Sequence, residues 1–183
     1  MEENTLKELN WIAHSENVFY SSEGIFVFTK GMQKHLVDFV SKSEYGIARI
    51  CAHNNQNDRL HEMVIVLKDS HYVPPHKHIN KSESFHVIEG ILGVIIFTDN
   101  GEIYKTIILD TERGSVFYRL SDELYHMVIS LTPYAVFHEI TNGPFKQNDS
   151  ELPLWAPNKN SDKNIIKKYH KQIIDFINQN NIE

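Results

Sequence analysis

The chain has 183 residues, of which 41% are hydrophobic and 23% are charged, a composition that suits one globular domain and excludes wholesale disorder. Its formal net charge of −6 argues against a nucleic-acid-binding protein, because phosphate contacts require clustered Lys and Arg. The single cysteine, Cys51, excludes an intrachain disulfide and a zinc site built from cysteines. No apolar run approaches the roughly 20 residues that cross a bilayer, and the acidic start lacks the features of a signal peptide. We therefore expect a cytoplasmic protein without a membrane span, and its 11 histidines direct attention to metal.

Two helical patterns precede the rest of the chain. A short one covers residues 6–13, and a longer one places Met32, Leu36, Phe39 and Val40 on one face. The longer pattern predicts an amphipathic helix of about ten residues. We therefore assign residues 1–45 to an N-terminal arm that contains this helix.

From Gly46 to Thr141 the sequence is rich in short runs of β-branched and aromatic residues. Turn residues separate these runs, and the Asn100-Gly101 step is a hairpin signal because both residues tolerate positive φ. The predicted strands are Ile47–Cys51, Met63–Leu67, Ser84–Ile88, Leu92–Thr98, Ile103–Leu109, Ser115–Tyr118, Tyr125–Leu131 and Ala135–Thr141. Eight short strands at this spacing predict an antiparallel sandwich or barrel, to which we assign residues 46–157.

The last part of the chain predicts a loop and then a helix. Residues 143–160 are polar and rich in proline, which indicates a wrapping loop. In the final segment, 158–183, apolar residues recur at steps of three and four, at Ile166, Tyr169, Ile173 and Ile177. This apolar stripe has to be buried, either on the chain's own barrel or on a partner chain.

His76 and His78 form the sharpest candidate site. Residues i and i+2 of a strand share a face, so both imidazoles can point into one cavity, and Glu83 can complete three facial ligands across a short bend. Imidazole with carboxylate suits Zn, Fe, Mn, Ni or Cu, and the open coordination positions suit catalysis. The alternative is that these histidines lie on a solvated loop.

A second group of polar residues can face the same cavity. Arg49, Cys51 and His53 alternate along one predicted strand, and Arg49 can hold a carboxylate or phosphate through two hydrogen bonds. The alternative for Arg49 is an exposed side chain. Lys81 is either an ammonium group in the pocket or a charge on a loop. Cys51 next to His53 also permits a nucleophile, although a buried cysteine is usually inert.

The spacing of the candidate ligands resembles the first motif of the cupin superfamily, in which a His-x-His pair is followed by Glu and Gly. The matching residues here are His76, His78, Glu83 and Gly90, while Ser70 replaces the leading glycine of the motif. The segment Gly114–His126 is similar to the second cupin motif, although it is one residue longer and lacks its Pro and internal Gly. The resemblance implies that His126 is the fourth metal ligand.

A longer stretch, roughly residues 30–157, resembles the WbuC-like cupin metalloproteins, which are associated with bacterial surface-polysaccharide (O-antigen) gene clusters. The matching segments are Arg49–His53, Asp58, Met63, Pro75–His78, Lys81–Phe85, Phe137–Ile140, Gly143–Phe145 and Trp155–Pro157. Two positions depart from these relatives. Cys51 stands where they usually have Asn, and His61 where they usually have Gln.

The resemblance implies an all-β double-stranded β-helix, the cupin jelly-roll barrel, with flanking N-terminal and C-terminal helices and one divalent metal (Zn, Fe, Mn or Ni). It also implies a metal-dependent enzyme acting on a carbohydrate or sugar-nucleotide, with Arg49, His53 and Lys81 binding the substrate. Tyr118 and Glu139 are candidates to donate and accept a proton in the cavity, and the alternative for Glu139 is an exposed carboxylate at the end of a strand. An Fe(II)-dependent dioxygenase and a non-catalytic sugar- or metabolite-binding protein are the alternatives. Similar cupins commonly pair through their sheets, so we expect a homodimer.

Overall fold

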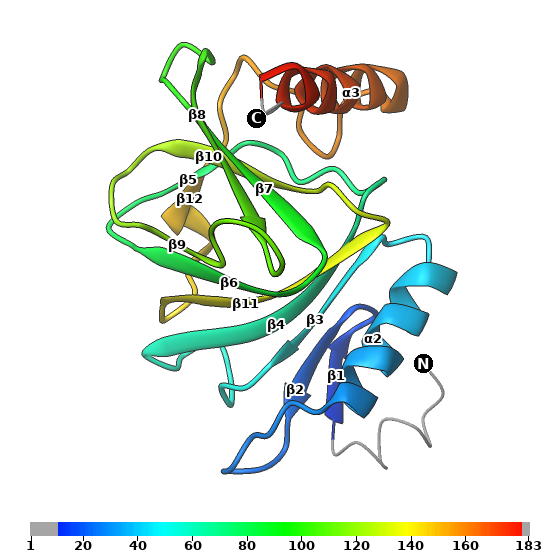
Figure 1. Ribbon diagram of the computed structural model, residues 1–183. Helices are drawn as coiled ribbons and strands as arrows, with labels where there is room; N and C mark the ends of the chain where they lie inside the picture. Colours follow the sequence, from blue (N-terminus) through cyan, green and yellow to red (C-terminus); the bar gives the residue numbers. More distant parts are fainter. Residues whose placement is uncertain (1–10, 181–183) are drawn as a thin grey trace.

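The computed structural model describes residues 11–180, which form a mostly β protein with two α-helices (Figure 1). The strands are β1 (Trp11–Ser15), β2 (Val18–Ser21), β3 (Ile47–Cys51), β4 (Leu60–Lys68), β5 (Lys77–His78), β6 (Glu83–Glu89), β7 (Ile91–Phe97), β8 (Ile103–Asp110), β9 (Phe117–Leu120), β10 (Tyr125–Ser130), β11 (Tyr134–Asn142) and β12 (Ser150–Glu151). The helices are α2 (Lys30–Lys42) and α3 (Lys163–Asn180), and a 3-10 turn, η1, covers Gln147–Asp149.

Two sheets face each other across the main core. The larger has seven strands in the order β1-β2-β3-β4-β11-β6-β9, and the smaller has the order β10-β7-β8. Side chains from both sheets form one buried cluster, in which Ile65 and Phe137 come from the larger sheet and Leu92 and Val94 from the smaller. The apolar alternation of these strands places every second side chain in this cluster.

The two larger sheets are not joined by a continuous ladder of hydrogen bonds within residues 11–180, so closure into a barrel is not seen there. The short strand β5 pairs with β12 in a separate two-stranded sheet. An antiparallel bridge between His76 and His126 links the approach to β5 with β10. The prediction of packed antiparallel sheets is confirmed, apart from the parallel pairing of β2 with β3.

All eight predicted strands are present, and four further strands were not predicted. The helical pattern at residues 6–13 is wrong for its last three positions, which lie in β1, while its earlier positions lie outside the described residues. β1 pairs with β2, and the Trp11 ring lies 5.7 Å from that of Phe19 in the buried cluster beneath α2. Burial of Trp11 and the ladder to β2 therefore outweigh the weak helical spacing.

The helix α2 covers the outer face of the larger sheet. Leu36 and Val40 are buried against the outward side chains of Ile50 and Val64. The helix begins two residues before its apolar pattern because the Thr29 hydroxyl caps it, accepting a hydrogen bond from the backbone N–H of Met32 at 3.2 Å.

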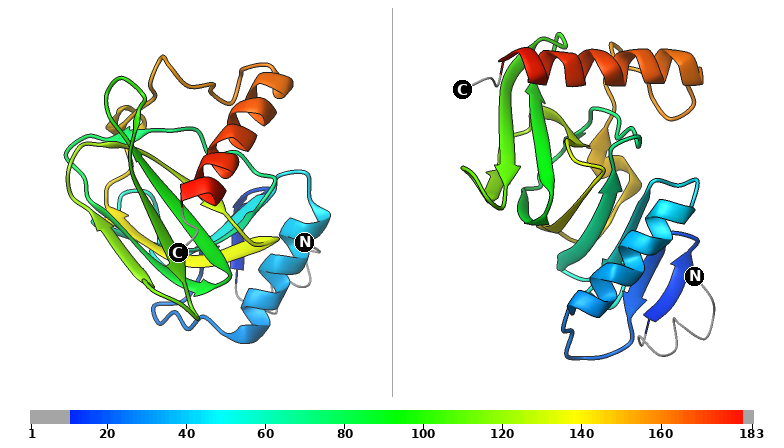
Figure 2. Two further views of the ribbon diagram at one scale, coloured as in Figure 1. Left: turned by 45° about the horizontal axis from the view of Figure 1, so that its top comes forward. Right: turned by 45° about the vertical axis from the view of Figure 1, so that its right-hand side comes forward.

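The helix α3 covers the outer face of the smaller sheet, and Figure 2 shows the two helices on different sheets. Ile173 and Ile177 are buried against Ile95, Met127 and Ile129. The apolar stripe of the predicted C-terminal helix is therefore covered by the chain's own sheet, which is one of the two burial sites that its pattern left open. Neither helix within residues 11–180 is apolar enough along its length to cross a membrane.

Candidate metal centre and cavity

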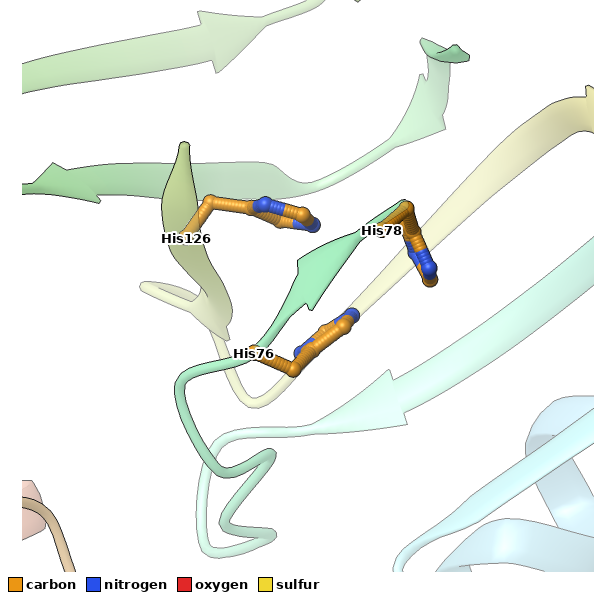
Figure 3. A group of neighbouring side chains, drawn as sticks. All are labelled: His76, His78 and His126. Atoms are coloured by element: carbon orange, nitrogen blue, oxygen red, sulfur yellow. The ribbon is translucent and has the colours of Figure 1, made fainter. Parts of the chain in front are cut away.

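Three imidazoles converge at one end of the space between the sheets. One ring nitrogen from each of His76, His78 and His126 lies within 4.8 Å of the others (Figure 3). His76 and His78 share a face because they are two residues apart in extended chain. The bridge between His76 and His126, with N···O distances of 2.9 and 2.8 Å, brings the histidine of β10 opposite them.

Backbone carbonyls fix the tautomers of two of these imidazoles. The Nδ1 atoms of His76 and His126 lie 2.9 and 3.0 Å from the carbonyl oxygens of Pro74 and Leu124. Because a carbonyl oxygen can only accept, Nδ1 must carry the proton and donate it, which leaves the Nε2 lone pair free. Such a hydrogen bond is the usual support of a metal-binding histidine.

The carboxylate of Glu83 lies beside the three imidazoles of His76, His78 and His126. Its Oε1 atom is 2.8 Å from Nε2 of His126, and its Oε2 atom is 3.4 Å from Nε2 of His78. Both Oε1 of Glu83 and Nε2 of His126 are buried, yet neither has a hydrogen bond of acceptable geometry. Two unsatisfied electron-pair donors that face each other beside two further imidazoles fit a bound cation.

The electrostatics of the site favour the metal-binding forms of His76 and Glu83, whereas burial lowers the pKa of His126 but the charge of Glu83 outweighs it and raises that pKa. Burial, and then the proximity of His126, lower the pKa of His76 to about 4. Burial would raise the pKa of Glu83, but the charge of His126 at 2.8 Å and the proximity of His78 and His76 outweigh it and hold the pKa at about 2. At neutral pH, His76 is therefore neutral and Glu83 is a carboxylate, the states in which both can act as ligands.

A cavity of about 400 Å³ opens beside the three imidazoles. The predicted substrate-binding residues Arg49, His53 and Lys81 all line it, as does Glu139. Tyr118 is not among the lining residues and is buried in the core, where its ring stacks on Phe85 at 5.4 Å. The structure thus brings every predicted site residue except Tyr118 to one cavity.

Arg49 has no carboxylate at ion-pair distance among residues 11–180. Its Nε atom is buried without a hydrogen-bond partner, and its Nη1 atom has only the weak contact with Met63 Sδ at 3.9 Å. A guanidinium group in this state lacks the counter-charge that compensates for its desolvation. The cavity therefore offers a site for an anionic group of a ligand.

Glu139 lies on the wall of the same cavity. Burial and the negative charge of Glu83 raise its pKa to about 7, although the positive charge of Arg49 opposes the shift. A carboxyl group with this pKa can both take up and release a proton near neutral pH.

Other lining residues are engaged by the chain itself. Lys81 forms an ion pair with Asp149 at 2.9 Å and donates a hydrogen bond to the carbonyl oxygen of Pro144, also at 2.9 Å. The rings of His53 and His61 stack at 4.2 Å. Burial raises the pKa of the Cys51 thiol to about 11, so it is not a thiolate nucleophile at neutral pH.

The chain was compared with protein families, curated proteins and solved structures. Residues 34–109, less than half of the chain, match a family described as "Domain of unknown function (DUF6016)". No curated protein matches the chain.

Among solved structures, an HTH_3 family transcriptional regulator from Vibrio cholerae is 23% identical and covers 55% of this chain and 52% of its own, with a TM-score of 0.39. A mutant of the oxalate decarboxylase OxdC from Bacillus subtilis is 21% identical (52% and 24% covered, TM-score 0.42). The capsular polysaccharide assembling protein CapF from Staphylococcus aureus is 16% identical (68% and 38% covered, TM-score 0.47). The chain thus spans about half, or less, of the length of these cupin-fold proteins.

Proposed function

We propose that the chain is a WbuC-like cupin metalloprotein that binds one divalent metal through His76, His78, His126 and Glu83. The observation that carries the proposal is the buried, unpaired Nε2 of His126, which faces the unpaired Oε1 of Glu83 beside the other two imidazoles. Imidazole and carboxylate ligands suit Zn, Fe, Mn or Ni.

We further propose that the protein is an enzyme whose substrate carries an anionic group. The bound metal would supply Lewis-acid polarisation of a carbonyl or a pair of hydroxyl groups. Arg49 would hold the anionic group through its unpaired guanidinium N–H groups. Glu139, which lines the cavity with a pKa of about 7, would take a proton from the substrate and return it. Tyr118 has no part in this proposal, because it is buried in the core and does not line the cavity.

A sugar phosphate or sugar-nucleotide is the substrate class that combines this anionic group with the polysaccharide role implied by the resemblance to WbuC-like proteins. The same ligand set also suits an Fe(II)-dependent dioxygenase, because three histidines and one carboxylate still leave octahedral positions open for oxygen. A binding protein that uses the metal only to orient its ligand is the third candidate.

The role of Arg49 can be tested by binding of UDP-glucose to the metal-loaded protein in a calorimeter. Loss of a hydrogen bond to a charged group costs about 1.5–3 kcal/mol, so Arg49→Met should weaken binding by roughly 10- to 150-fold. Arg113→Met, at an exposed loop position, is the matched control and should bind like wild type. Equal affinity of the two variants would contradict the assignment of the anionic group to Arg49.

Turnover separates the three classes of function. Oxygen consumption with Fe(II) and a candidate substrate would identify the dioxygenase, whereas conversion of the sugar without oxygen would support the enzyme proposed here. If the protein binds the sugar but does not convert it with Zn, Fe, Mn or Ni, the remaining candidate is the non-catalytic binding protein.

A further inference from the structure

The imidazole of His78 is supported differently from those of His76 and His126. Each of the latter two donates from Nδ1 to a backbone carbonyl two residues earlier in its own segment. The Nδ1 atom of His78 instead lies 3.1 Å from the side-chain Oγ of Ser150, which is 72 residues further along the chain. The orientation of His78 thus depends on a distant segment.

That segment, residues 146–157, is called the strap because it contains β12, which pairs with β5. Its strand β12 pairs with β5 so that Ser150 lies opposite His78, and the carbonyl of Asp149 accepts a hydrogen bond from the N–H of Ile79 at 2.9 Å. The ion pair between Asp149 and Lys81 fixes the same end of the strap. Figure 1 shows β12 beside β5 at this point.

The opposite end of the strap is anchored away from the metal centre. Trp155 donates from Nε1 to the carbonyl of Asp99 at 3.0 Å, and its ring packs against Phe97 and Tyr125 at 5.1 and 5.7 Å. A Cβ on Gly101 would lie 2.6 Å from the Trp155 ring, so the contact is close. The strap is therefore held by apolar packing at one end and by polar contacts at the site.

We propose that Ser150 is a positioning residue for the metal ligand His78, so that completion of the metal centre depends on the docked strap. The inference rests on the proposed function, because it assumes that His78 binds metal through Nε2, the atom that lies 3.4 Å from Oε2 of Glu83. For this, Nδ1 of His78 must carry the proton and donate it to the Ser150 hydroxyl oxygen.

A hydroxyl group suits the imidazole of His78 because a hydroxyl can either accept a hydrogen bond from Nδ1 or donate one to it. When no metal is bound, Nε2 of His78 can carry the proton toward Glu83, and the Ser150 hydroxyl then donates to Nδ1. A carbonyl oxygen, such as those beside His76 and His126, cannot make this change. Ser150 therefore keeps His78 oriented in both tautomers.

The test compares the Zn²⁺ affinities of three full-length variants by competition with a chromophoric chelator. Loss of such a supporting hydrogen bond weakens metal binding by about 10- to 100-fold. Because Ser150 is exposed and water can partly replace its hydroxyl, we expect a loss of about tenfold for Ser150→Ala. Ser150→Thr keeps the hydroxyl and should restore wild-type affinity, and Co²⁺ absorption spectra should change only in the alanine variant.

Glu151→Gln is the matched control. It weakens the ion pair between the strap and Lys77 at the neighbouring position of β12 and leaves the contact with His78 in place. We expect Glu151→Gln to bind Zn²⁺ with the affinity of the wild-type protein. We also expect metal-free Ser150→Ala to have the melting temperature of the metal-free wild-type protein.

The outcomes separate the two proposals. Wild-type affinity in Ser150→Ala, or an equal loss in Ser150→Ala and Glu151→Gln, would overturn the role of the Ser150 hydroxyl while leaving the metal site intact. Failure of the wild-type protein itself to bind Zn²⁺, Fe²⁺, Mn²⁺ or Ni²⁺ would overturn the proposed function.

Discussion

Gly90, the last residue of the segment that resembles the first cupin motif, should be intolerant of any side chain. It forms the turn between β6, which carries Glu83, and β7 of the facing sheet, with φ at +78°. A Cβ at this position would lie 2.5 Å from the carbonyl oxygen of Tyr134 and 2.6 Å from Oγ1 of Thr132. Neither atom can move away easily. The Tyr134 oxygen belongs to the backbone, and the Thr132 hydroxyl accepts a hydrogen bond from the N–H of Ile91 and donates one to the carbonyl of Tyr134.

The expected cost of Gly90→Ala has two parts. A left-handed conformation costs an L-residue about 1–2 kcal/mol, and forcing atoms into packed surroundings costs about 1–3 kcal/mol more. The free energy of unfolding should therefore fall by about 2–5 kcal/mol, measured by urea denaturation of the metal-free protein.

Gly114→Ala separates these two contributions. Gly114 also has a positive φ, +83°, but a Cβ there would have no atom within 4 Å. This variant should lose only about 1–2 kcal/mol, the conformational part. If Gly90→Ala and Gly114→Ala lower the free energy of unfolding equally, the close approach of Tyr134 to Gly90 does not constrain this turn.

Three further predictions concern the metal, pH and assembly. Chelation should lower the melting temperature but leave a cooperative transition, because the buried clusters form without the metal; an unfolded chain after chelation would indicate a structural site. Burial, and then His170, lower the pKa of His71 from 6.5 to about 4, so the unfolded chain binds the proton more readily and stability should fall as pH drops from about 6.5 to 4. His71→Gln should flatten this dependence, and an unchanged pH profile would contradict it. Light scattering should give a homodimer, and ending the chain at Asn160 should destabilise each protomer by uncovering the sheet beneath α3; a full-length monomer would refute the dimer.

The strands that the sequence predicted are runs rich in β-branched and aromatic residues, and turn residues separate them. Asn100-Gly101 is an example, since Gly101 adopts a φ of +87° between β7 and β8. The strands β5 and β12 were not predicted because two residues cannot show a period, and β1 has only one buried side chain, Trp11.

The candidate metal ligands could be predicted from the sequence because His76 and His78 have the spacing of one strand face, and the segment ending at His126 resembles a second motif. The contact of Ser150 with His78 could not be predicted from the sequence, because no local pattern specifies which residue of a loop will pair with a strand residue 72 positions earlier. The apolar stripe of α3 likewise predicted that this face is buried, but not against which surface. In the structure the stripe packs against Ile95 and Met127 of the smaller sheet.

Metal content of the purified protein tests the central claim most directly. Elemental analysis of wild-type protein prepared without chelator should show about one divalent metal per chain, and His76→Ala and His126→Ala should lose it. His86→Ala, at an exposed position of β6, is the control and should retain the metal. Wild-type protein that contains no metal and takes up none of Zn, Fe, Mn or Ni, or a His126→Ala variant that keeps the metal, would contradict the site described here.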